Sequence, residues 1–177
     1  MTRWIAPLAA LMIGLTPAGA KPVGAPDFPT GSVAFFGLHF IDTSTEGAVN
    51  GARPDQAQRL DMARDFVAEQ FSSAGFDMLD LAPVQATLDR TANPAHCNGC
   101  EVKMARELGA DYALVGEVQK VSNLILSMNL VLRDAETGRA IRAAAVDIRG
   151  NTDDSWRRGI SYLLRNRIFH DTTGGRK

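Results

Sequence analysis

The only two cysteines of the chain lie three positions apart, in the run Cys97-Asn98-Gly99-Cys100. Gly99 lets the chain turn sharply enough for the two sulfurs to close a small disulfide ring. The pair also precedes a predicted helix, whose amide dipoles would stabilise a thiolate, so a redox-active dithiol is a second interpretation. His96 adjoins Cys97, and these three side chains together could begin a metal site, which is the third.

The first residues of the sequence indicate export to an oxidising compartment. Arg3 precedes an apolar run at residues 4–15, which has the length of a signal-peptide core and is too short to span a bilayer. Ala18-Gly19-Ala20 follows as a small-x-small cleavage site. We expect a periplasmic protein that begins at Lys21, has no stable membrane anchor after cleavage, and carries its cysteines as a disulfide.

A polar loop is expected at residues 42–53, and it is long for a plain connection. Asp42, Thr43, Ser44 and Glu46 give this loop oxygen atoms that could bind a ligand or a cation, although a solvated loop explains them too. We find no phosphate loop, nucleophile elbow, zinc helix or calcium loop. We therefore expect neither an enzyme nor a bound cofactor.

Composition favours one globular domain. The formal charge is −1 and 45% of the residues are hydrophobic, which excludes the clustered basic surface of a nucleic-acid-binding protein. The expected organisation is a signal peptide at residues 1–20, a flexible leader at 21–30, a single globular domain at 31–170 and a disordered tail at 171–177.

The first strand is expected at residues 32–41, and it is apolar on both faces, as in a sheet that helices cover. Strict alternation places Val33, Phe35, His39 and Ile41 on one face and Ala34, Phe36, Leu38 and Phe40 on the other. His39 is then a buried histidine with a hydrogen-bond partner. The helix that opens at Pro54 should end at Gly75. A short strand at 77–81 and helices at 83–90 and 101–108 complete this half.

The last third has the clearest pattern. Strands are predicted at residues 112–121, 124–133 and 141–148, with short turns between them, and a helix begins at Thr152 or Asp153. This order indicates an α/β (α+β) fold, in which helices pack on a mixed sheet that ends in an antiparallel meander.

Four segments together resemble a family of predicted secreted bacterial proteins with a domain of unknown function. They are Phe40-Ile41-Asp42-Thr43-Ser44, the cysteine motif at 97–100, residues 121–126 and residues 147–153. The resemblance covers nearly the whole chain after the signal peptide. Such relatives are sometimes encoded beside periplasmic quinoprotein alcohol dehydrogenases, which implies an accessory role in an oxidoreductase system.

A more distant resemblance involves residues 108–118 and 134–139, which are similar to the N-terminal domain of TolB and to CsgG-like lipoproteins. It implies the fold of envelope domains that bind partners and catalyse nothing. Our first hypothesis is therefore a non-catalytic periplasmic binding or accessory protein with a protein partner in the envelope. The alternatives are a thiol-redox protein that uses Cys97 and Cys100, and a carrier of a small ligand or metal.

Overall fold

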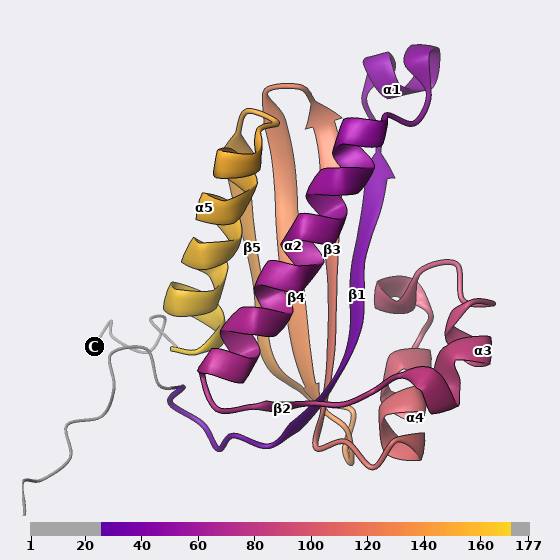
Figure 1. Cartoon of the computed structure of the whole chain (residues 1–177), viewed down its shortest axis with the longest axis vertical. Helices are drawn as coiled ribbons and strands as arrows, with labels where there is room; N and C mark the ends of the chain where they lie inside the picture. Colours follow the sequence, from indigo (N-terminus) through magenta and orange to yellow (C-terminus); the bar gives the residue numbers. More distant parts are fainter. Residues whose placement is uncertain (1–25, 171–177) are drawn as a thin grey trace, which may run out of the picture.

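The computed structural model describes residues 26–170, which build a five-stranded sheet in the order β2-β1-β3-β4-β5 with helices on both faces (Figure 1). The strands are β1 (Ser32–Asp42), β2 (Asp77–Met78), β3 (Tyr112–Ser122), β4 (Ile125–Asp134) and β5 (Ala140–Arg149). The α-helices are α1 (Thr45–Asn50), α2 (Pro54–Ser73), α3 (Gln85–Leu88), α4 (Cys100–Glu107) and α5 (Asp153–Leu163). Two short 3-10 helices, η1 (Ala82–Val84) and η2 (Pro94–His96), and a π-helical turn that continues α5, η3 (Leu164–Ile168), complete the elements of the described residues.

The sheet is mixed, as the sequence predicts. β1 pairs in parallel with both β2 and β3, whereas β3, β4 and β5 are successive antiparallel neighbours. The expected C-terminal meander is therefore confirmed, and the α+β fold class with it.

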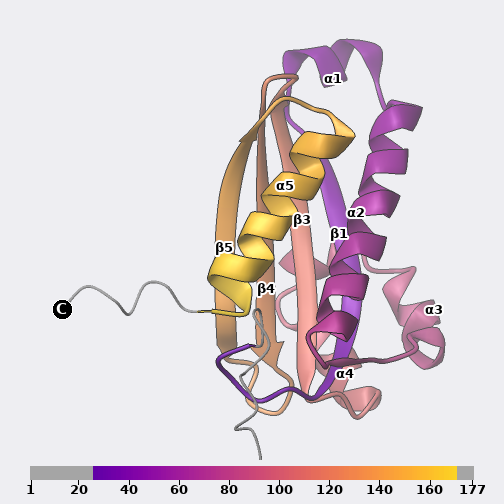
Figure 2. The same ribbon diagram turned by 60° about the vertical axis from the view of Figure 1, so that its left-hand side comes forward.

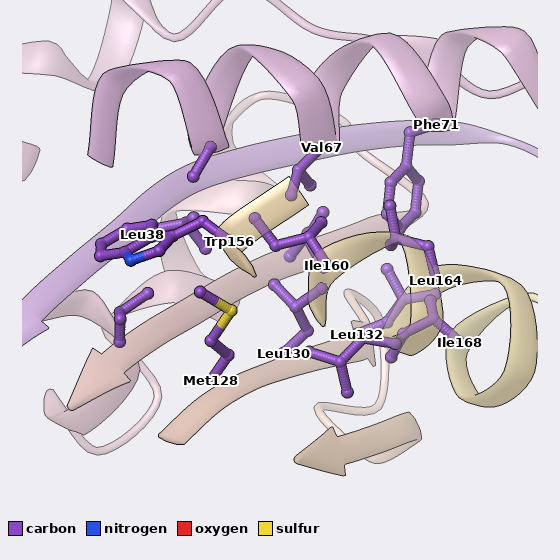
Figure 3. Close-up of a cluster of buried hydrophobic side chains, with 14 of the residues drawn as sticks. Leu38, Val67, Phe71, Met128, Leu130, Leu132, Trp156, Ile160, Leu164 and Ile168 are labelled. Atoms are coloured by element: carbon purple, nitrogen blue, oxygen red, sulfur yellow. The ribbon is translucent and has the colours of Figure 1, made fainter. Parts of the chain in front are cut away.

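One face of the sheet is fully packed. Helices α2 and α5 lie side by side across it, as both views show (Figures 1 and 2). The alternation of β4 directs Met128, Leu130 and Leu132 toward these helices, where they meet Phe71 of α2 and Trp156 of α5 (Figure 3). Pro54 at the start of α2 and the Thr152 hydroxyl, which accepts from the Ser155 amide, begin these two helices where the sequence indicates.

The opposite face is covered only in part. Helix α4 and the turns before it pack on β1 and β3, around a second core that includes Phe36, Met104 and Val115. Farther across this face, Ala143 and Ala145 of β5 are exposed. The two faces of one sheet thus differ in how much of them is buried.

A bulge in β1 corrects the predicted faces of this strand. The register with β3 shifts between Phe35 and Leu38, and Gly37 adopts a φ of 84°. The extra residue reverses the alternation, so Leu38 and Phe40 join Val33 and Phe35 on the α2 face. His39 instead lies on the other face, opposite Glu117 in the register with β3, and is only half-buried. Alternation alone was wrong here, although a glycine inside a strand is a known signal for a bulge.

Other differences are small. The expected polar loop contains α1, β2 has two residues, and α4 begins at Cys100. The predicted signal peptide at 1–20, the start of the leader and the tail at 171–177 lie outside the described residues. No helix within residues 26–170 has the length and apolar character that a membrane span requires.

Candidate functional site

The cysteine motif forms a disulfide turn between η2 and α4. Cys97 and Cys100 are joined by a disulfide, with a Cα–Cα distance of 5.5 Å. Asn98 and Gly99, the two residues between them, have φ angles of 58° and 94°. Asn and Gly are the residues that adopt this left-handed region most readily, so the local sequence suits the turn. Cys100 is the first residue of α4, and the disulfide fixes how the chain enters that helix.

A carboxylate lies against the disulfide. Glu101 Oε2 is 3.2 Å from Cys97 Sγ, and the Glu101 side chain is only 6% exposed. Its other oxygen faces Arg133 Nε at 3.2 Å, an ion pair whose angle is poor for a hydrogen bond. A negative charge beside a sulfur disfavours a second negative charge on it, so Glu101 opposes a reactive thiolate at Cys97. The geometry favours a structural disulfide.

His96 pairs with a carboxylate on the sheet, whereas the sequence suggested a metal site shared with the two cysteines. Its Nε2 lies 2.7 Å from Glu117 Oε2 on β3, and Asn93 Nδ2 donates to the same oxygen at 3.1 Å. Within the described residues, the side chains that cluster as candidate metal ligands are Cys97, Cys100 and Glu101. His96 instead ties the disulfide turn to the sheet.

The second candidate region is the α1 loop, residues 42–53, which follows β1. Asp42 Oδ1 accepts hydrogen bonds from the Ser44 amide at 2.9 Å and the Ser44 hydroxyl at 2.5 Å. Ser44 in turn caps α1 by accepting from the Gly47 amide at 3.0 Å, and Thr43 bonds the Lys120 carbonyl. The hydrogen bonds of Asp42, Thr43 and Ser44 therefore stabilise the conformation of the loop itself.

Lys120 of β3 holds this loop on the sheet, and sequence reasoning missed it. Its side chain is completely buried, with Nζ 3.1 Å from Asp42 Oδ2 and 3.6 Å from Glu46 Oε2. Burial raises the pKa of Asp42, but the hydrogen bonds from Ser44 and the charge of Lys120 outweigh burial and lower it overall. Asp42 and Lys120 are 78 residues apart, so only the β1–β3 pairing brings them together.

A pocket of about 560 Å³, here called the α1 pocket, opens between the α1 loop and the start of α2. Asp42, Thr43 and Ser44 line it, as a binding loop would, whereas Glu46 is not part of the lining and its carboxylate lies 3.6 Å from Lys120 Nζ. The remaining wall includes Phe40 and Gln56, neither of which the sequence indicated as a site residue. Both could be located only once α2 was placed beside β1.

Exposed apolar side chains gather at the same end of the molecule. Among the described residues, four large hydrophobic side chains are exposed, and three of these are Val49 on α1 and Val121 and Leu124 at the β3–β4 turn. Both segments lie at the top of Figure 1, beyond the end of β1. We call this surface the α1 end.

Comparison with solved structures shows the fold. The C-terminal domain of LpoB from Salmonella enterica has a TM-score of 0.53 and 15% identity, covering 70% of this chain and 87% of that one. The same domain from Escherichia coli has a TM-score of 0.50 and 16% identity, covering 74% of this chain and 88% of that one. At these identities the likeness concerns the fold alone.

The TolB resemblance is weaker in the structures. TolB from Acinetobacter baumannii matches with a TM-score of 0.36 and 13% identity, over 80% of this chain and 29% of that one. The CsgG-like part of the resemblance stays a prediction. No curated protein matches the sequence significantly.

The resemblance to a family of unknown function is confirmed at the level of the family. One family matches residues 31–168, a range that runs from the residue before β1 to the end of η3 and contains both candidate regions. This chain belongs to that family, DUF3280, whose description is protein of unknown function (DUF2380).

Proposed function

We propose that this chain is a non-catalytic binding or accessory protein of the bacterial periplasm, and that it binds a protein partner of the cell envelope through the α1 end. The observation that carries the proposal is the gathering of Val49, Val121 and Leu124 there, at 77%, 49% and 71% exposure. Apolar side chains grouped on an otherwise polar surface are typical of protein-binding sites. The LpoB-like fold supports this assignment by analogy.

A matched pair of variants tests the surface. Purified protein would be used to capture partners from periplasmic extract, beside a variant with both Val121→Ser and Leu124→Ser. We expect the double variant to fold and to lose its partner, because it removes apolar area from the α1 end only. Tyr162→Ser on α5 is the control, since Tyr162 is exposed but lies elsewhere. Equal capture by all three proteins would refute the surface.

The periplasmic location is tested separately, since residues 1–20 precede the described part of the chain. We propose that the signal peptide is cleaved after Ala20. Intact-mass measurement on the periplasmic fraction should then give a protein that begins at Lys21. Recovery of the uncleaved chain from the membrane fraction would contradict this proposal.

The finer proposal is that the partner belongs to a periplasmic quinoprotein oxidoreductase system. Its support is the resemblance to secreted relatives encoded beside such enzymes. The same capture experiment decides it, because the captured proteins are identified by mass spectrometry. A partner outside such a system would leave the accessory role standing and remove this assignment.

The thiol-redox alternative makes an opposite prediction about the disulfide. A structural disulfide should have a reduction potential below about −300 mV, whereas exchange catalysts lie well above that value. Glu101 beside Cys97 supports the structural assignment. The redox protein would be favoured instead by a reduction potential near those of the exchange catalysts, together with a thiol–disulfide exchange activity that Cys97→Ser abolishes.

A further inference from the structure

The α1 pocket has the size and lining of a small-molecule site. Its volume of about 560 Å³ lies within the roughly 300–1,000 Å³ typical of such sites. Phe40, Ala48 and Leu60 provide apolar wall. The Phe40 ring is itself backed by Trp156, with the two ring centroids 6.1 Å apart, so this wall is part of the packed core.

One buried polar group in this wall lacks a partner. Gln56, in the first turn of α2, is 3% exposed. Its amide nitrogen Nε2 is buried and makes no hydrogen bond with any described residue. Folded proteins leave few buried donors unpaired, and each exception calls for an explanation such as a bound group. Gln56 lines the pocket, so a rotation of its side-chain amide would let a ligand there with an acceptor oxygen satisfy this donor.

The charges around the pocket are already paired with one another. The carboxylate of Asp42 is held by Lys120, and the guanidinium of Arg53 lies 2.9 Å from Asp55. Hydrogen bonds from Arg53 and then Arg59 lower the pKa of Asp55 to about 2, so Asp55 stays ionised and this pairing persists at neutral pH. The two charged side chains of the lining, Asp42 and Arg53, are thus already in ion pairs, so an uncharged ligand fits better than an ionic one.

We propose that the α1 pocket binds a small uncharged organic molecule with an apolar body and one carbonyl oxygen, which accepts a hydrogen bond from Gln56 Nε2. The apolar body lies against Phe40 and Leu60. The pocket adjoins the partner surface proposed above, since Ala48 of its wall precedes Val49, but binding in the pocket uses none of the exposed side chains of the β3–β4 turn.

Three six-carbon probes test the chemistry on the purified protein: 2-hexanone, hexanoate and hexylammonium. Binding is followed by NMR shifts of the backbone amides of Ala48, Gln56 and Leu60. We expect 2-hexanone to shift these amides with a Kd at least tenfold lower than either charged probe. Gln56→Leu keeps the shape of the wall but removes the donor, so it should weaken 2-hexanone binding about tenfold.

Gln58→Leu is the matched control, because Gln58 is exposed two residues away on the same helix. It should leave the Kd unchanged. Without any probe, Gln56→Leu should also raise the melting temperature, since it removes an unpaired buried donor, and Gln58→Leu should not.

The proposal fails if the three probes bind equally, or if none binds while Gln56→Leu lowers the melting temperature. The first result would mean that the amide is not used, and the second that it bonds a structural water. No protein partner is present in these titrations, so they can fail independently of the capture experiment.

Discussion

The disulfide turn and the α1 loop are two connections that contact β1 and β3, but different forces hold them. A covalent bond between neighbours in sequence closes the disulfide turn. The α1 loop depends on Lys120, a buried cation from a distant strand, and on hydrogen bonds around Asp42. The comparison teaches that the first turn can keep its shape without much of the fold, whereas the second requires the finished sheet.

The largest expected effect comes from the ion pair of the α1 loop. Asp42→Ala leaves the fully buried ammonium of Lys120 with only Glu46, 3.6 Å away, and also removes the one oxygen that accepts both hydrogen bonds from Ser44. We expect a loss of about 3 kcal/mol in the free energy of unfolding, measured by urea denaturation. Asp61→Ala, which breaks an exposed pair with Arg64, should cost less than about 1 kcal/mol. Equal losses would mean that Lys120 does not anchor the loop.

Glycine substitutions compare the two regions directly. A Cβ at Gly47 would fall on the Asp42 carboxylate, so Gly47→Ala must displace an ion-paired group and should cost about 1–3 kcal/mol. A Cβ at Gly99 meets nothing within 4 Å, and Gly99→Ala costs only its strained φ of 94°, about 1–2 kcal/mol. Thermal melts of the two variants measure the difference. The steric explanation further requires that Asp42→Ala relieve part of the Gly47→Ala penalty.

Removal of the disulfide should have a smaller effect. The bond closes a loop with only two residues between the cysteines, so it removes little entropy from the unfolded chain. Replacing both Cys97 and Cys100 by Ser should therefore cost about 2 kcal/mol or less and leave partner capture intact. Denaturation and capture are measured on the same preparation. A variant that no longer folds would show that the turn has a larger role than this comparison gives it.

The smallest expected effect is the pH dependence of the α1 loop. The pKa of Asp42 is lower in the folded protein than the ordinary value near 3.9, so its contribution is complete above about pH 4 and is lost as the pH falls through the folded pKa. The loss is small because a protonated carboxyl still bonds Ser44. The Gly47 amide shift, followed by NMR, should titrate there in the wild type but not in Asp42→Asn. The disulfide does not titrate, so the chemical shift of the Lys103 amide of α4 should not change with the titration of Asp42.

The sequence predicts what depends on near neighbours. Alternation located the strands of the meander, and the spacing of Cys97 and Cys100 indicated the disulfide, because these signals need only a few adjacent residues. The sequence could not indicate Lys120 or Gln56 as site residues. A lysine in a strand gives no sign that it is buried, and Gln56 lines a pocket only because α2 crosses the sheet beside β1. The reversed faces of β1 arose from one bulge at Gly37, which shifts every later residue of that strand.

The parallel pairing of β1 with β3 also has a kinetic consequence. Ser32 bonds Asp111 across 79 residues at one end of the pair, and Asp42 meets Lys120 across 78 at the other. The β3–β5 meander, by contrast, joins strands that follow one another in the chain. Because contacts distant in sequence form slowly, the meander should assemble first and β1 should dock late. The α1 loop and its pocket then form only in that last step, and hydrogen exchange should find them among the earliest parts to open.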